Sequence, residues 1–156
     1  MNASARNKLA AALAECILHA EILAEDLNEH GEPAYTAASL DTLDKARRRL
    51  LDQMAYRFTK LQVTLGEQVL PLLLEQAEEP LADDTPFAQK LQRLERIDII
   101  PSAEQWRELR MARNIIAHEY PDAPELKAAA LNQLVRSVAD LLQFWRHVHQ
   151  HANRID

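Results

Sequence analysis

The chain has 156 residues and a formal net charge of −6, from 18 basic and 24 acidic side chains; this length suits one domain, and the acidic balance argues against a general nucleic-acid binder. Only 2 glycines and 5% aromatic residues accompany 47% hydrophobic residues, a composition that favours helix throughout. Apolar stretches fall short of the roughly 18 residues of a membrane span, and a signal-peptide pattern is absent, so we expect a cytoplasmic protein without a membrane partner.

The first long predicted helix spans about residues 4–29, where leucine, isoleucine and alanine recur at helical spacing. Gly31 and Pro33 then end it. Ser39 or Asp41 can cap the second helix. The lone Cys16 lies on the apolar side of the first helix; it excludes an internal disulfide and is expected to be a buried small hydrophobe.

The second predicted helix carries an apolar stripe from Leu43 to Leu65. Gly66 and Pro71 interrupt this pattern, so we expect a kink or a break there. Residues 69–74 form a short, very apolar run. That run belongs either to the core or to a subunit interface.

The second half of the chain contains a loop and three further helices. The sequence predicts the loop at residues 78–86 and a short helix at residues 87–97. Residues 102–120 form the next helix, in which Ser102 and Gln105 make a capping-box pattern and Pro121 forces an end. The last helix runs over 124–149, with a frayed tail at 150–156. The prediction is an up-and-down bundle of four long helices and a short one, in a single domain over residues 1–156.

The helix at 102–120 presents two different faces. Its apolar stripe consists of Trp106, Leu109, Ala112 and Ile116. Arg110, Asn114 and His118 follow one another at spacings of four, so they share another face of an ideal helix. If the last turn unwinds before Pro121, His118 and Tyr120 instead lie at a helix end, where side chains can reach a groove.

Positive charge is concentrated between Lys45 and Lys60, where Asp52 is the one acidic residue. The simplest interpretation of such a run is a solvated helix face. A local basic groove that holds phosphates is the alternative, and Arg48 and Arg57 in this run, with Arg110, are its candidate RNA-binding residues.

Arg113, Asn114, His118 and Tyr120 form the pattern R-N-x-x-x-H-x-Y. This pattern resembles the R-x4-H-x-Y signature of HEPN domains (higher eukaryotes and prokaryotes nucleotide-binding), in particular the HepT-type toxins that are paired with minimal nucleotidyltransferase antitoxins. The resemblance implies a HEPN-like helical bundle and a two-fold homodimer. It also implies a composite cleft at the dimer interface, with Arg113 and His118 from both chains, in a metal-independent endoribonuclease.

The residue types suit that chemistry. Histidine exchanges protons near neutral pH, so His118 suits an acid or base acting on the ribose 2′-OH. The fork of donors on Arg113 suits a phosphate, and Asn114 can orient the phosphate or the imidazole. In the resembling toxins the tyrosine is the residue to which the partner transferase attaches AMP, which makes Tyr120 the expected acceptor.

Other interpretations of the same residues stay open. Arg113 can pair with a carboxylate such as Glu119, and His118 can simply cap a helix end. At the level of function, the alternatives are a non-catalytic HEPN binding partner of a minimal nucleotidyltransferase and a helical dimer with unrelated partners. Phosphate-binding loops are missing, and the spacing of His147, His149 and His151 fits no zinc signature, so we expect neither a cofactor nor a metal.

Overall fold

A computed structural model of the chain describes residues 1–77 and 81–154, and every regular element within these ranges is helical. The all-helical prediction is therefore confirmed for this part of the chain. The elements, in chain order, are α1 (Ala3–His30), α2 (Ala37–Leu40), α3 (Lys45–Thr64), the π-helical segment η1 (Leu65–Val69), α4 (Leu70–Gln76), α5 (Phe87–Arg96), α6 (Ala103–Ala117) and α7 (Pro124–Arg154).

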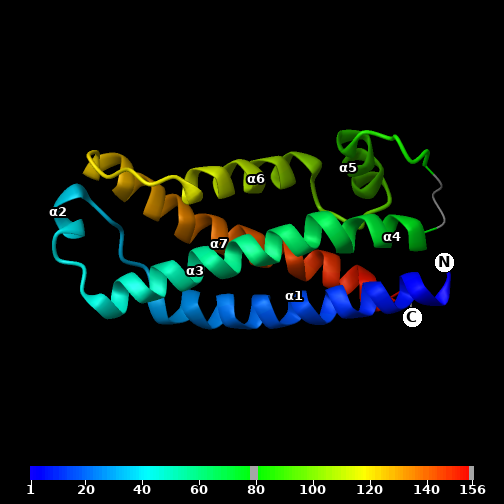
Figure 1. Cartoon of the computed structure of the whole chain (residues 1–156), viewed down its shortest axis with the longest axis horizontal. Helices are drawn as coiled ribbons and strands as arrows, with labels where there is room; N and C mark the ends of the chain where they lie inside the picture. Colours follow the sequence, from blue (N-terminus) through cyan, green and yellow to red (C-terminus); the bar gives the residue numbers. More distant parts are fainter. Residues whose placement is uncertain (78–80, 155–156) are drawn as a thin grey trace.

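The long helices lie side by side as a bundle (Figure 1). Helices α1, α3, α6 and α7 follow one another in alternating directions, and η1 and α4 continue the line of α3. Helices α3 and α7 each contact the other three long helices, whereas α1 and α6 lie at opposite corners of the bundle. The N-terminus and the end of α7 lie at the end of the bundle where α4 and α5 are found (Figure 1).

Helix α1 begins and ends through local side-chain and backbone chemistry. The Asn2 side chain accepts a hydrogen bond from the backbone N–H of Ala5 at 2.8 Å. At the other end Gly31 adopts a φ of 71°, which glycine tolerates because it has no Cβ atom. Cys16 is fully buried, as expected.

The caps predicted for the second long helix are wrong. Thr36 and Ser39 cap each other reciprocally and start the separate short helix α2, which the sequence pattern did not predict. Helix α3 starts later, at Lys45, because the Asp44 carboxylate accepts from the backbone N–H of Arg47 at 2.7 Å. Asp41 is left at the end of α2.

The chain also does not break at Gly66 and Pro71. It stays helical and passes through the π turn of η1, in which the Leu70 N–H donates to the Leu65 carbonyl. Pro71 cannot donate to the carbonyl four residues before it, and the wider π turn accommodates this loss. Val69, Leu70, Leu73 and Leu74 are buried, so the apolar run belongs to the core rather than to an interface.

The ends of α5 and α7 also differ from their predicted positions. Helix α5 ends at Arg96, one residue early, and the chain turns through Asp98 at a φ of 63°. Helix α7 continues to Arg154, beyond the predicted end at His149, because Val148 and Ala152 extend its buried stripe. Residues 155 and 156 of the expected frayed tail, and 78–80 of the expected loop, lie outside the described residues.

The core runs along the whole bundle. Phe58 on α3 and Phe144 on α7 are completely buried, and Trp106 and Trp145 are almost so, at 3% and 4% exposed. Trp106 is thus buried in the core, as its place in the apolar stripe predicts. Within the described part of the chain, none of the helices has the length and apolar character needed to cross a membrane.

Candidate functional site

Helix α6 is positioned by hydrogen bonds at its first turn. The Ser102 hydroxyl accepts from the backbone N–H of Gln105 at 3.1 Å, as the capping pattern predicts. The carboxylate of Glu95, on α5, accepts from the N–H of Ala103 at 3.0 Å. These contacts fix where α6 begins, and therefore which of its side chains meet α3 and α7.

The helix turns its apolar stripe inward. Trp106, Leu109 and Ala112 are buried, and Ile116 is partly buried against the core. Arg110 and Asn114 are exposed on another side. The predicted division of the helix into an apolar and a polar face is therefore confirmed as far as Ala117.

His118 lies outside the helix. It is the C-cap residue with extended backbone (φ −84°, ψ 132°), and its N–H donates to the Ile115 carbonyl at 3.2 Å. The structure thus follows the alternative in which the last turn unwinds before Pro121; the proline directly disfavours helical backbone at Tyr120, and the helix ends three residues before that, at Ala117. His118 consequently leaves the face that Arg110 and Asn114 share.

His118 and Tyr120 contact each other beyond the end of α6. Their ring centroids are 4.6 Å apart and the rings meet edge to face, at 66°. His118 is exposed and Tyr120 half-buried. Both line a pocket of about 360 Å³ between the end of α6, α3 and α7, whose other walls include Asp52, Ile116, Glu119, Lys127 and Leu131.

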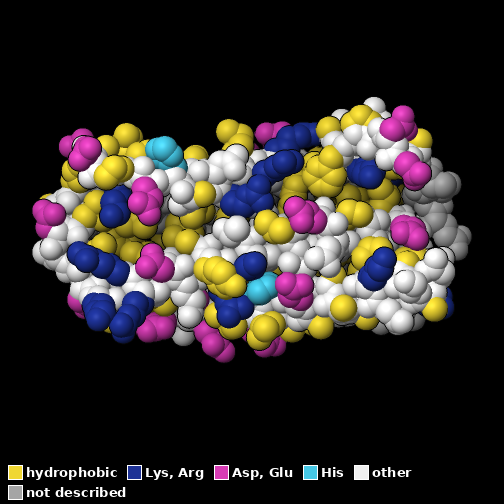
Figure 2. All heavy atoms as spheres, in the orientation of Figure 1, with side chains coloured by type: hydrophobic (Ala, Val, Ile, Leu, Met, Phe, Trp, Pro, Cys, Tyr) yellow, Lys and Arg dark blue, Asp and Glu magenta, His cyan; other side chains and the backbone are white. Residues whose placement is uncertain are grey.

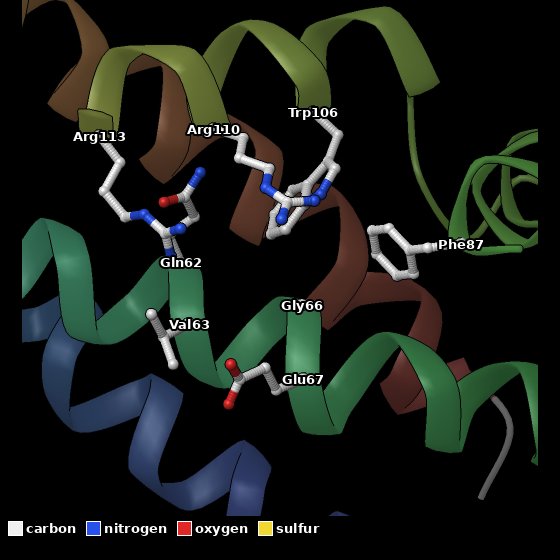
Figure 3. A pocket seen from close by; sticks show the side chains of 8 residues that line it. All are labelled: Gln62, Val63, Gly66, Glu67, Phe87, Trp106, Arg110 and Arg113. Carbon is white, nitrogen blue, oxygen red and sulfur yellow. The ribbon is translucent and has the colours of Figure 1, made fainter. Parts of the chain in front are cut away.

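Arg110 and Arg113 lie in a second pocket, of about 280 Å³. Its walls come from α3, η1, α5 and α6, and Figure 3 shows all of the lining residues: Gln62, Val63, Gly66, Glu67, Phe87, Trp106, Arg110 and Arg113. In this view the amide of Gln62 lies between the two arginine side chains. Figure 2 shows Lys and Arg side chains in a row over α6, beside hydrophobic side chains that reach the surface.

Within one chain, the four residues of the pattern R-N-x-x-x-H-x-Y therefore do not line the same pocket. Arg113 lines the α3–η1–α6 pocket, whereas His118 and Tyr120 line the pocket beside α7. Asn114 is exposed and lines neither of the two. A site that uses Arg113 and His118 on the same phosphate therefore has to span both pockets, within one chain or across two.

The side chain of Arg113 is free to bind an anion. Within the described residues it makes no ion pair and no hydrogen bond, so the pairing with Glu119 considered above is not present. Arg110 is likewise unpaired in this part of the chain. Arg107, one turn earlier on the same helix, instead pairs with Glu104 at 3.3 Å.

The other two candidate arginines lie apart from these pockets. Arg48 is exposed on the first turn of α3. Arg57 is half-buried; its Nη1 lies 2.9 Å from Nδ1 of His19 on α1, and its guanidinium lies over the ring of Tyr56. Neither arginine lines the two pockets that hold Arg113 and His118.

Gln62 is a residue of the Arg113 pocket that the sequence did not indicate. It is only 2% exposed, and neither its amide oxygen nor its amide nitrogen has a hydrogen-bond partner within the described residues. The indole nitrogen of Trp106, in the same pocket, is also buried without a partner. The signal that could have indicated Gln62 is its spacing, four residues after Phe58 and three before Leu65, which places it beside the apolar stripe of α3.

The C-terminal histidines make separate contacts. The ring of His147 hydrogen-bonds through Nε2 to the carbonyl of Asp98 at 2.9 Å, and His149 stacks on Trp145. Across the described ranges, no group of three or more potential metal-binding side chains comes together.

Comparisons with family models, with curated proteins and with solved structures give no match for this chain. The assignment of a function therefore depends on the residues described above and on their geometry.

Proposed function

We propose that this chain is a HEPN-type toxin of a toxin–antitoxin pair, a metal-independent endoribonuclease that works as a two-fold dimer. The observation that carries the proposal is the end of α6. There, an exposed His118 on extended backbone follows Arg113, whose guanidinium has no partner within the described residues. An exposed proton-transfer group and a free phosphate-binding group lie within two turns of one another.

The reaction would proceed by attack of the ribose 2′-oxygen on the adjacent phosphorus. His118 takes the 2′-OH proton, and the bond from phosphorus to the 5′-oxygen breaks. That oxygen leaves with a proton from a second acid, so the products are a 2′,3′-cyclic phosphate and a 5′-OH end. Arg113 binds the non-bridging oxygens, on which negative charge grows.

A dimer supplies what one chain lacks. Each chain offers one histidine at this site, whereas the reaction uses both a base and an acid. Met111 and Ile115 lie one turn apart on α6 and are 65% and 40% exposed, an apolar surface beside Arg113. Packing this face of α6 on its symmetry mate is an isologous contact that would bring two copies of Arg113 and His118 together.

Tyr120 is the proposed point of control by a minimal nucleotidyltransferase antitoxin. Its ring touches His118, so AMP attached to its hydroxyl would place a bulky anion beside the proton-transfer group. That anion would compete with the RNA phosphate. Mass spectrometry of the chain after incubation with the cognate transferase and ATP tests this step; an adduct on another residue would contradict it.

The alternative is a HEPN protein that binds a minimal nucleotidyltransferase without cleaving RNA. Two observations favour it: Arg113 and His118 line different pockets within one chain, and the net charge is −6. In this case the pair of pockets would serve as a docking surface for the partner.

Growth of a bacterial host that expresses the chain alone separates these functions. The parent should arrest growth, while His118→Ala and Arg113→Ala at equal protein levels should not. Arg107→Gln is the matched control, because Arg107 pairs with Glu104 and lines neither pocket; it should arrest growth like the parent. If expression of the parent chain leaves growth unaffected, the non-catalytic function is favoured.

A further inference from the structure

We propose that the pocket between α6 and η1 accepts one unpaired nucleobase of the RNA, with the amide of Gln62 hydrogen-bonded to the edge of the base. This inference rests on the proposed function, since it assigns a specificity pocket to the same substrate. Apart from Arg113, the residues that it uses lie outside the R-x4-H-x-Y pattern, and its evidence is the set of side chains in Figure 3.

Gln62 provides the strongest evidence. A buried amide without a hydrogen bond destabilises the folded protein, and both polar atoms of this amide are buried and unpartnered within the described residues. The amide presents one donor next to one acceptor. Nucleobases carry a donor beside an acceptor on their hydrogen-bonding edges, and glutamine pairs with adenine through two such bonds. A base in this pocket would satisfy both atoms at once.

Aromatic rings form the apolar walls of the pocket. Trp106 comes from α6 and the half-buried Phe87 from the first turn of α5, and Figure 3 shows both rings on the same side of the cavity. Unpaired bases stack on aromatic side chains at a gain that does not depend on base identity. The half-buried Phe87 would therefore stack on a base and the buried Trp106 would close the inner wall, while Gln62 would discriminate among bases.

The positive charges lie where a phosphate would follow the base. Arg110 is exposed and Arg113 half-buried on the same wall, three residues apart on α6, and neither is paired within the described residues. Glu67, on η1, forms the opposite wall and would repel a phosphate there. The charge distribution thus orients a nucleotide with its phosphate toward α6, where Arg113 also serves the proposed cleavage.

The main chain contributes the shape of the pocket. Its lower wall includes Gly66, in the π-helical segment, and a side chain at that position would meet Trp106. Single π turns within α-helices occur frequently at functional sites. A base can enter this recess only when it is out of a duplex stack, so the pocket is suited to single-stranded RNA.

Nuclear magnetic resonance can follow the pocket through its own tryptophan. The chain has two tryptophans, Trp106 in the pocket and Trp145 in the core, and a Trp145→Phe variant assigns the two indole N–H signals. The titration uses ¹⁵N-labelled His118→Ala protein, which should not cleave RNA, and the four nucleoside 5′-monophosphates. We expect at least one of them to shift the Trp106 signal and leave the Trp145 signal in place.

Matched variants decide whether Gln62 is responsible. Gln62→Leu, of similar volume, should weaken that binding about tenfold, which is the effect of losing roughly 1.4 kcal/mol of hydrogen bonding. Gln68→Leu changes an exposed glutamine of the adjoining segment η1 and should bind like the parent. Arg110→Gln should also weaken binding, whereas Arg107→Gln should not. Ribose 5-phosphate, which lacks a base, should bind at least about tenfold more weakly than the best nucleotide.

The inference fails if no nucleotide shifts the Trp106 signal, if Gln62→Leu binds as tightly as the parent, or if ribose 5-phosphate binds as well as the nucleotides. These results are independent of catalysis, because the protein used carries alanine at position 118. If the protein binds nucleotides through Gln62 but does not cleave RNA, the proposed base-binding pocket stands and the proposed nuclease function fails. If the protein cleaves RNA but binds no nucleotide in this pocket, only the proposed base-binding pocket fails.

Discussion

Trp106 packs directly on the backbone of Gly66: a Cβ atom at position 66 would lie 2.7 Å from Cζ2 of the indole. This approach is closer than real Cβ atoms make, so only glycine fits beneath the ring. The same indole contacts Phe144 on α7, with the ring centroids 5.3 Å apart. One tryptophan thus fixes the distance from α6 to both the π-helical segment and α7.

The first prediction follows from this contact. Gly66→Ala should destabilise the fold, because overpacking costs about 1–3 kcal/mol and alanine gains only about 1 kcal/mol over glycine in a helix. Trp106→Phe removes the atoms that the new methyl group meets. In that background Gly66→Ala should cost less, and denaturant unfolding of the four proteins measures the difference. If Gly66→Ala lowers the free energy of unfolding equally in both backgrounds, the contact between Trp106 and position 66 is contradicted.

A second prediction concerns the proposed dimer face. Met111→Glu and Ile115→Glu each place a charge in the apolar surface of α6, and together they should convert the dimer into a monomer while leaving the helix content unchanged. Light scattering coupled to size exclusion gives the mass. Leu18→Glu, at an exposed leucine of α1, is the control and should remain a dimer. A double variant that is still dimeric would place the interface elsewhere.

A third prediction concerns the buried Asp26 of α1. Burial is the largest effect and raises the pKa of its carboxyl; Glu29 and Glu25 raise it further, while the hydrogen bond from Gln53 and the charge of Arg57 lower it. Because the pKa in the folded state lies above that in the unfolded state, the contribution of Asp26 to stability is full below about pH 4 and is lost as the pH rises.

Asp26→Asn should therefore raise the melting temperature at pH 7, with a smaller gain at pH 4, because asparagine can still accept from Gln53 and carries no charge. Thermal unfolding at the two pH values measures this dependence. Glu21→Gln, at an exposed position of the same helix, should change little at either pH. A loss of stability of Asp26→Asn at pH 7 would contradict this prediction, because it would show that the ionised Asp26 carboxylate stabilises the folded protein.

Local signals in the sequence predicted much of the fold. Gly31 ends α1 and Ser102 caps α6, since both act through backbone groups within a few residues. The π-helical segment could not be predicted in this way. Gly66 and Pro71 indicate that regular helix is disturbed, but whether the chain breaks or widens depends on Trp106, which packs there from a distant helix.

The same distinction applies to the candidate site. The spacing from Arg113 to His118 is local, and Pro121 explains why the helix cannot continue as far as Tyr120. That the two residues line different pockets depends on how α3 and α7 cover the ends of α6, which helical periodicity does not specify. Gln62 follows Phe58 by four residues and precedes Leu65 by three, so its spacing places it beside the apolar stripe of α3. That its amide is enclosed without a partner depends on the packing of α6 against α3.

The central claim is that Arg113 and His118 form a nuclease site, and cleavage of single-stranded RNA by the purified chain tests it most directly. The assay includes EDTA and is run on the parent, His118→Ala, Arg113→Ala and the control Arg107→Gln. We predict that the parent and the control cleave RNA to 2′,3′-cyclic phosphate ends and that both alanine variants lose activity by at least about 100-fold, the usual contribution of one proton-transfer or charge-stabilising group. Equal cleavage by the parent and His118→Ala, or none by any of the four, would contradict it.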